Sequence, residues 1–367
     1  MGKHLVFVGG GHAHLGPLSR LDAFVERRHR VTLVSLEDYH YYSGMGPGLL
    51  GGFYEPPQAR FPLKTLAKDL GAAFVRGRVI RIDADAHELE MESGATVSYD
   101  VVSFNTGSVV PPPPPPGQRP DVYPVKPIEH LVQARDAISH RLAEGETVRV
   151  LVIGGGPAGV EVAGNSLGLA EEAPGSLSLT LIAGSRVLAG FPDRARRLAL
   201  DSLSSRGAEV REDKWVEELG DDYALTSGGE RYGCDVTLVA TGVRPSKLFT
   251  RSGLPSTADG ALRVNDRLQC VRHPEMFGGG DCVGIEGKDL ARVGVHAVMQ
   301  GPVLFDNLMA ALEDGELRTY KPPRNYVLIL NMGDGSGIAW KWGLTVDGGL
   351  TFKLKDFIDR RFVGKYQ

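Results

Sequence analysis

Two stretches with one shared pattern decide the fold: LVFVGGGHAHLG at residues 5–16 and LVIGGGPAGVEVAG at residues 151–164. Each begins with an apolar run typical of a buried strand, passes through a glycine-rich turn and leads into residues typical of a helix. In such a turn the first glycine permits a tight bend and the second lets the backbone approach a pyrophosphate, which lies at the helix N-terminus. Each stretch therefore predicts the phosphate-binding loop of a Rossmann-type domain.

The first loop departs from the full Gly-x-Gly-x-x-Gly pattern because His14 stands where the third glycine is expected. That glycine normally allows close packing of helix on strand, so this packing is in doubt here. The residues predicted to contact a nucleotide are Gly9, Gly11, His12, Ala13 and His14. The acidic residue expected about 20 residues further on is missing from the strand end, which leaves Ser35 and Glu37 as candidates to hold a ribose.

The second loop matches the pattern fully with Gly154, Gly156 and Gly159. The strand that follows ends in Ser185 and Arg186, without the acid that selects a free ribose hydroxyl. Arg186 is therefore predicted to accept a 2′-phosphate, and the alternative is that it is only a solvated surface arginine.

Further signatures follow in both halves of the chain. Each half contains a later buried strand that ends in Thr-Gly, and an apolar run at 276–277 precedes a Gly-Asp pair. The binding residues predicted there are Thr106, Gly107, Thr241, Gly242, Gly280 and Asp281. Two such sets make chance a poor explanation and predict a duplicated dinucleotide-binding fold.

The remaining periodicity predicts the other elements. Expected strands are 31–35, 99–104, 177–182, 235–240, 326–331 and 337–343, and residues 79–97 are expected to form a small meander. Expected helices are 13–27, 160–169 and 294–312. Six prolines at 111–116 predict a stiff linker at a domain boundary. The fold class is thus α/β, with two Rossmann-like domains and a small C-terminal α+β segment. We expect one domain over 1–112 and 255–319, a second over 113–254 and the C-terminal segment over 320–367.

Composition limits the partners and the location. Apolar residues make up 42% and charged residues 23% of the chain, and the net charge is only −4, so no positive field favours nucleic acid. The three cysteines are widely spaced, which argues against a disulfide framework or metal site and favours a reducing, cytoplasmic setting. No apolar run approaches the roughly 20 residues of a membrane span.

With both loops and the Gly-Asp pair, the chain resembles the pyridine nucleotide–disulfide oxidoreductase superfamily, flavoproteins with two dinucleotide-binding domains. The resemblance covers nearly the whole chain. It implies that Gly9 and Gly11 bind FAD, that the second loop binds NAD(P)H, and that Asp281 binds the ribityl chain of the flavin.

Within the superfamily the chain closely resembles type II NADH dehydrogenases and sulfide:quinone reductases, and it resembles still more closely the flavin module fused ahead of selenide, water dikinase. The matching stretches are GGGHAHLG, YYSGMGPGLLGG, VGVHAVMQGPVLFDNL and LKDFIDRRF. Disulfide reductases carry a Cys-x4-Cys pair early in the FAD domain, and this region has no cysteine. The cysteines needed for persulfide chemistry are also missing. The quinone motif Ala-Gln-x-Ala-x-Gln has become 294–299, GVHAVM, without its glutamines.

The resemblance also suggests functional residues near the flavin. Glu161 is expected near the nicotinamide, with charge stabilisation of a helix N-terminus as the alternative. The helix starting near Gly294 is expected to direct its N-terminus at the flavin, with Val298 near the cofactor. His296 is the second catalytic candidate, with a packed histidine as the alternative.

The tail at 352–366 is a basic amphipathic segment with Phe352, Leu354, Phe357, Ile358 and Phe362 near one side. It is expected either to lie on an anionic membrane at its inner face, which suits a quinone acceptor, or to dock on the FAD domain or on a second subunit of a homodimer. The acceptor stays open between a quinone, a sulfur or selenium species and a partner protein, and a non-enzymatic flavin-binding protein is the remaining alternative.

Overall fold

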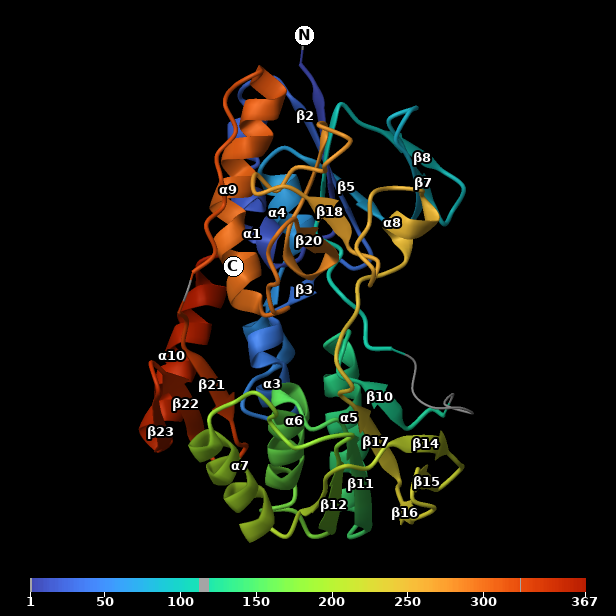
Figure 1. The fold of residues 1–367 in the computed structure, drawn as a ribbon, viewed down its shortest axis with the longest axis vertical. Coiled ribbons are helices and arrows are strands. Elements are labelled where there is room, and N and C mark those ends of the chain that lie inside the picture. The colour runs from blue at the N-terminus through green and yellow to red at the C-terminus, as the bar shows by residue number, and fades with distance from the viewer. Residues whose placement is uncertain (1, 112–118, 324) are drawn as a thin grey trace.

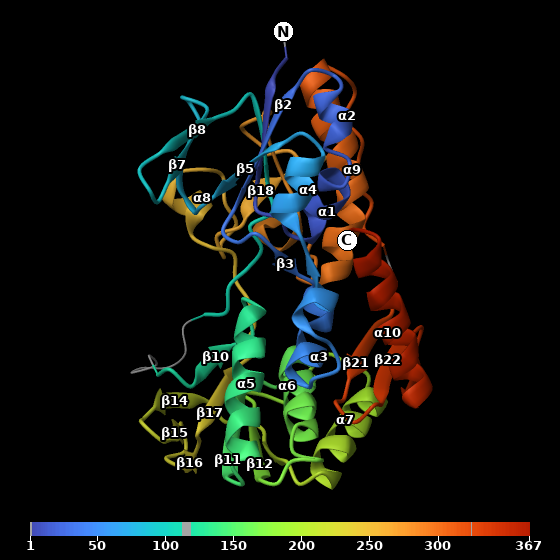
Figure 2. The ribbon, with the colours of Figure 1, turned by 180° about the vertical axis from the view of Figure 1, so that it is seen from behind.

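A computed structural model of the chain describes residues 2–111, 119–323 and 325–367. Two α/β bodies lie one above the other along the long axis, and the C-terminal segment lies along one side of both (Figures 1 and 2). Each body is built on a five-stranded sheet. The predicted proline linker falls, apart from Pro111, outside the described ranges.

The first sheet has the order β19-β9-β1-β2-β5, and all neighbouring strands are parallel. Its strands are β1 (His4–Val8), β2 (Arg30–Ser35), β5 (Ala73–Arg76), β9 (Val101–Phe104) and β19 (Met276–Gly278). β1 and β9 are buried along their whole length, as expected for a parallel sheet covered on both faces. Because β19 comes from far along the chain, the first body is discontinuous, as the fold-class prediction required.

The second sheet repeats this layout with the order β10-β17-β11-β12-β13, again all parallel. Its strands are β10 (Val122–Pro124), β11 (Thr147–Ile153), β12 (Ser176–Ile182), β13 (Glu209–Arg211) and β17 (Val236–Val239). The helices around it are α5 (Glu129–Ala143), α6 (Pro157–Gly168) and α7 (Asp193–Ser205). The predicted α/β class with two Rossmann-like sheets is confirmed.

Each body also carries a three-stranded antiparallel meander. The predicted one consists of β6 (Val79–Asp83), β7 (Glu88–Met91) and β8 (Thr96–Ser98); the second, of β14 (Val216–Leu219), β15 (Tyr223–Thr226) and β16 (Arg231–Gly233), was not predicted. Its strands are too short and too polar to produce a clear alternating pattern. The shorter elements are β3 (His40–Tyr41), α3 (Gly46–Leu50), β4 (Arg60–Phe61), α4 (Leu63–Asp69), α8 (Leu248–Arg251), β18 (Leu262–Val264) and β20 (Val283–Ile285).

The predicted helix over 13–27 is wrong in its extent, because the structure divides it into α1 (His12–Leu18) and α2 (Asp22–Val25). Pro17 lies inside α1 and has no N–H to donate. Around Arg20 the backbone hydrogen bonds join residues three positions apart instead of four; the Arg20 N–H, for example, donates to the Pro17 carbonyl. Such tight turns replace α-helix between the two segments.

The C-terminal segment is a small α+β unit, as predicted. It contains β21 (Leu328–Asn331), β22 (Gly337–Lys341), β23 (Leu344–Gly348) and α10 (Gly349–Gly364), and it follows the long helix α9 (Gly294–Glu313). The predicted strand over 337–343 ends early because Trp342 and Gly343 both have positive φ and form a hairpin turn, which starts β23.

Candidate functional site

The first glycine loop is held by Asn105, which sequence reasoning passed over. Gly9 has a φ of +86°, and a Cβ there would lie 2.4 Å from the Asn105 carbonyl oxygen, so only glycine fits this turn. The Asn105 side chain accepts a hydrogen bond from the Ala13 N–H at 3.0 Å and donates to the Gly279 carbonyl at 2.6 Å. Asn105 therefore ties the first loop to the Gly-Asp motif.

His14 takes a packing role in place of the missing third glycine. Its side chain is fully buried, with Nδ1 2.6 Å from the Gly9 carbonyl oxygen and Nε2 2.8 Å from the Ser103 hydroxyl. Burial lowers the pKa of His14 to about 4, although the bond to Gly9 opposes this. Both ring nitrogens are thus used within the protein, and a contact of His14 with the cofactor stays a prediction. The packing that seemed in doubt is achieved by a hydrogen bond.

The fold of the second loop requires glycine at two of its three glycine positions, Gly154 and Gly159. Gly154 has a φ of +125°, and a Cβ on Gly159 would lie 1.8 Å from the Gly154 carbonyl oxygen. A Cβ on Gly156, in contrast, would meet no atom within 4 Å, so the loop opens there onto free space. Neither α1 nor α6 has a side-chain N-cap. N–H groups of an uncapped first turn favour an anion such as a pyrophosphate.

The residues expected at the ribose positions lie at the carboxyl edges of the two sheets. Ser35 is buried at the end of β2, whereas Glu37 is exposed and lies 2.5 Å from the Arg76 guanidinium. Arg186 is exposed and pairs with Asp193 at 2.5 Å. Both charged candidates thus have protein partners that a ribose or phosphate would have to displace or share.

The Thr-Gly motifs lie where the parallel strands end. Thr106 Oγ1 is buried and has no hydrogen-bond partner within the described part of the chain. A buried hydroxyl without a partner is unfavourable unless a ligand or water satisfies it. Thr241 and Gly242 are exposed beyond β17, at the same edge of the second sheet as the second loop.

Asp281 is the centre of a polar group that joins the two bodies. Its Oδ2 accepts from the Ser108 hydroxyl at 2.6 Å and from Lys126 Nζ at 2.9 Å. Burial alone would raise the pKa of Asp281, but Lys126 and Ser108 outweigh it, and the pKa lies below its ordinary value. Asp281 is therefore ionised at neutral pH. The sequence contains no motif that would have found Lys126 or Ser108.

The start of α9 adjoins this group. Gln300 Oε1 accepts from the Gly280 N–H at 2.6 Å and so positions the Gly-Asp motif, while Val298 is half-buried on the same helix. His296 is buried, with Nδ1 3.5 Å from the Tyr320 hydroxyl. Burial lowers the pKa of His296. The structure therefore presents a neutral, packed histidine, and a catalytic role for it stays a prediction.

His12 of the first loop and His40 form a pair of histidines close to Phe362 of the C-terminal helix α10. His12 Nδ1 lies 3.2 Å from His40 Nε2, and the His12 ring lies 5.2 Å from the Tyr42 ring and 6.5 Å from Phe362. Burial, together with a smaller effect of Lys126, lowers the pKa of His12 to about 4. Both imidazoles are neutral at pH 7, because burial also lowers the pKa of His40.

Glu161 lies in the second turn of α6. The helix dipole acts mainly on the first turn, so dipole stabilisation does not explain this residue. Glu161 Oε1 accepts from the Asn331 N–H at 2.9 Å. Desolvation raises the pKa of Glu161 to about 7, while Lys355 and the Asn331 N–H oppose the rise. Lys355 in turn donates to the Gly44 carbonyl at 2.6 Å and pairs with Asp359 at 2.5 Å.

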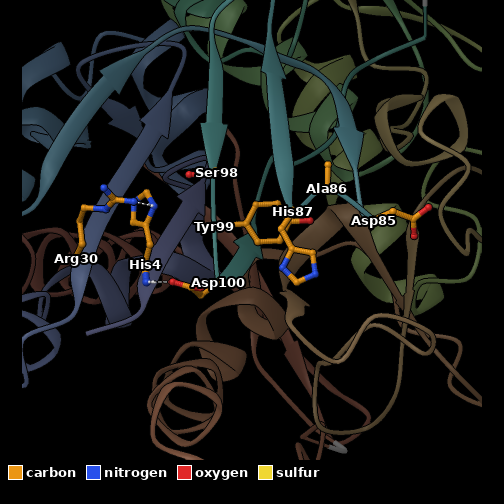
Figure 3. A pocket seen from close by; sticks show the side chains of 8 residues that line it. All are labelled: His4, Arg30, Asp85, Ala86, His87, Ser98, Tyr99 and Asp100. Atoms are coloured by element: carbon orange, nitrogen blue, oxygen red, sulfur yellow. Dashed lines mark hydrogen bonds between the residues drawn. The ribbon is translucent and has the colours of Figure 1, made fainter. Parts of the chain in front are cut away.

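The surface of the first body has two hollows, and only one of them adjoins the candidate site. One of about 490 Å³ is lined by His4, Arg30, Asp85, Ala86, His87, Ser98, Tyr99 and Asp100 (Figure 3). It lies at the amino ends of β1, β2 and β9, opposite the edge where ligands of parallel sheets bind, and His4 bonds both Arg30 and Thr32 there. The second, of about 310 Å³, is lined by Asp281, Arg292 and His296 among others and adjoins the Gly-Asp motif.

The residues present fit two dinucleotides. Each sheet has a glycine loop at its carboxyl edge, and the first also has the unpartnered Thr106 hydroxyl and the ionised Asp281. FAD, when bound, supplies the redox chemistry, and the protein supplies binding and orientation. Fold and site together define a two-domain flavin- and nicotinamide-dependent oxidoreductase.

Comparison with known proteins gives the family. The profile of pyridine nucleotide-disulphide oxidoreductases matches residues 3–301, and the chain belongs to this family. It is an FAD-dependent NAD(P)H oxidoreductase. The three cysteines are buried and free.

The chain is similar to ferroptosis suppressor protein 1 of Taeniopygia guttata, with 25% identity over 91% of this chain and 87% of that protein. It is similar to the type II NADH:quinone oxidoreductase of Staphylococcus aureus strain NCTC 8325, with 22% identity over 99% and 96%. Its fold matches NDH2 of Plasmodium falciparum in complex with NADH, with a TM-score of 0.79, 13% identity and coverage of 100% and 99%.

Proposed function

We propose that this enzyme passes electrons from NAD(P)H through FAD to a quinone that it meets at a membrane surface. The C-terminal patch carries the proposal. It consists of the exposed apolar residues Trp342, Leu344, Val346, Leu350, Leu354, Phe357 and Ile358. Their exposed fractions range from 46% to 83%. Apolar side chains exposed so close together in one segment of the chain indicate an interaction surface.

The apolar residues of α10 do not share one face, which corrects the expectation for the tail. Phe362 packs inward, 4.8 Å from the Tyr42 ring, and Phe352 packs 5.0 Å from the Phe53 ring. Leu354, Phe357 and Ile358 face outward. The helix therefore docks on the FAD-binding body and still presents an apolar surface.

Charge and position support a membrane as the partner of the C-terminal patch. Lys353 and Arg361 are exposed on the same helix, and exposed Lys365 follows directly after it. Such cations favour an anionic lipid surface. Within the described residues, no helix is both long and apolar enough to cross a bilayer. The proposal thus keeps the expected cytoplasmic enzyme at the inner face of the membrane, and a homodimer stays a prediction.

The site behind the patch suits a quinone acceptor. Quinone reduction by NAD(P)H takes up one proton in addition to the hydride, and Glu161, with a pKa of about 7, can supply it at neutral pH. The charge of Lys355 on α10 acts on Glu161 of α6 and opposes the rise of its pKa. The same helix α10 carries the patch residues Leu350, Leu354, Phe357 and Ile358. The similarity to the type II NADH:quinone oxidoreductase of Staphylococcus aureus supports the same acceptor.

Anaerobic titration tests the proposed function. We expect NADH or NADPH to bleach the flavin absorbance. A short-chain ubiquinone or menaquinone should restore the absorbance at least as fast as the enzyme turns over in the steady state. Bleaching by neither nucleotide would contradict the electron donor. Bleaching that no quinone reverses, while a soluble dye does, would contradict only the acceptor.

The double variant Leu350→Glu/Phe357→Glu is expected to reduce binding to vesicles of anionic lipid by about tenfold or more, because each change removes apolar burial and adds repulsion. Flotation with vesicles of phosphatidylglycerol and phosphatidylcholine measures this. Ile80→Glu is the matched control, since Ile80 is also exposed but lies on the meander β6. Equal loss in both proteins would show a general charge effect and contradict the patch.

Arg186→Ala is expected to raise KM for NADPH about tenfold and to change KM for NADH less than twofold, because a charge-assisted bond to the 2′-phosphate is lost. Steady-state kinetics with both nucleotides gives the ratio. Arg194→Ala is the control, since Arg194 is exposed one residue beyond Asp193. An equal rise for both nucleotides would exclude selective recognition by Arg186.

A further inference from the structure

The carboxyl edge of the second sheet carries an aromatic side chain that has no assigned role. Trp215 is 66% exposed, and within residues 119–254, all of which the structure describes, no other large apolar side chain is exposed. It lies in the connection between β13 and β14. Tryptophan is enriched where proteins contact ligands and partners, so an exposed indole at the edge where a nucleotide is expected is a candidate contact.

The local backbone holds Trp215 beside the end of β12. The Lys214 N–H donates to the Ala183 carbonyl at 3.0 Å, and the Ser227 N–H donates to the Trp215 carbonyl at 2.8 Å. A Cβ on Gly184 would lie 2.8–2.9 Å from three atoms of the indole, Cε2, Cζ2 and Cδ2. These nearly equal distances place a face of the indole, not its edge, against Gly184.

This position corresponds to the adenosine half of a dinucleotide. In a Rossmann sheet the pyrophosphate lies at the loop after the first strand and the ribose at the end of the second. Here these are the loop starting at Gly154 and the strand end at Gly184 to Arg186. The connection after the third strand, β13, comes next along the same edge, and it contains Trp215.

We propose that Trp215 is the platform on which the adenine of the nicotinamide nucleotide stacks. Gly184 leaves room for the indole on one side, and the exposed face is available to the base. The inference rests on the proposed placement of NAD(P)H at the second loop and adds a residue that sets affinity for the adenine. It concerns binding alone and no chemical step.

The test separates adenine from nicotinamide. Base–aromatic stacking predicts that Trp215→Ala weakens ADP-ribose binding about 5- to 150-fold, measured by calorimetry, and raises KM for NAD(P)H equally while kcat at saturation is unchanged. Trp215→Phe should recover most of the affinity. Reduced nicotinamide mononucleotide, which lacks adenine, should bleach the flavin at the same rate in wild type and both variants.

A measurement on the wild type guards against misfolding of the alanine variant. ADP-ribose should quench the tryptophan fluorescence of the wild type, and the quench should vanish in Trp215→Phe, which retains Trp340 and Trp342. ADP-ribose binding that is equal or tighter in Trp215→Ala would overturn the proposal, tighter binding meaning that the indole obstructs the base. Failure of ADP-ribose to bind the wild type would instead contradict the nucleotide site itself.

Discussion

Asp281→Ala is expected to yield a folded protein whose affinity for FAD is about 10- to 150-fold lower, the cost of losing a hydrogen bond to a charged group. Asp281 is ionised, and only Oδ2 is used by Ser108 and Lys126. We find no donor to Oδ1 among residues 2–111, 119–323 and 325–367, so this oxygen is available to a hydroxyl of the ribityl chain. The ratio of flavin to protein absorbance after gel filtration measures the loss, and titration with FAD gives the affinity.

Asp289→Ala is the matched control for this prediction, because Asp289 is an exposed acid eight positions along the same segment. It should keep its FAD. A normal melting temperature of Asp281→Ala in the presence of saturating FAD would show that the fold has survived. If Asp281→Ala retained FAD as firmly as the wild type, the assignment of Asp281 to the cofactor would be wrong.

The two glycine loops were predictable because their chemistry is local. Gly9 and Gly154 need positive φ, which is a property of their own backbone, and a Cβ on Gly159 would collide with Gly154, five positions earlier. Requirements set within one loop leave a readable pattern. The strands were predictable for the same reason, since buried parallel strands are continuous apolar runs.

The residues that join distant segments left no such pattern. Lys126 lies 155 positions from Asp281, and Asn105 lies 174 positions from Gly279. Only the topology, with β19 returning beside β9, brings these groups together. His14 shows the opposite problem: its pattern suggested a ligand contact, whereas tertiary packing gave both of its nitrogens to protein groups.

The tail shows where periodicity misleads. Its apolar residues predicted one face, but the docked side of α10 is polar at its centre, with the buried pair of Lys355 and Asp359. The raised pKa of Asp359, caused first by desolvation and opposed by Lys355, shows how strongly the pair is shielded from water. An ion pair inside a docking face cannot be inferred from hydrophobic spacing.

Glu161→Gln is expected to lower turnover with quinone about 100-fold or more, the usual contribution of a positioned proton donor. Since desolvation raises the pKa of Glu161 to about 7, the carboxyl is protonated below that pH and loses its proton above it. The wild-type rate with quinone should therefore fall as the pH rises through about 7. Glutamine cannot donate a proton in this way, so the profile of the variant should be flat over this range. Steady-state rates between pH 5.5 and 8.5 measure both effects.

The two half-reactions locate the defect. Bleaching of the flavin by NAD(P)H should proceed in Glu161→Gln at close to the wild-type rate, while reoxidation by quinone is slow. Glu171→Gln is the matched control, because Glu171 is an exposed carboxyl just beyond the end of α6. If bleaching slowed and reoxidation did not, Glu161 would serve the nicotinamide, as the sequence alone suggested. The proton required by the quinone would then have to come from another group, and Lys355, whose Nζ is already held by Gly44 and Asp359, would be the next residue to replace.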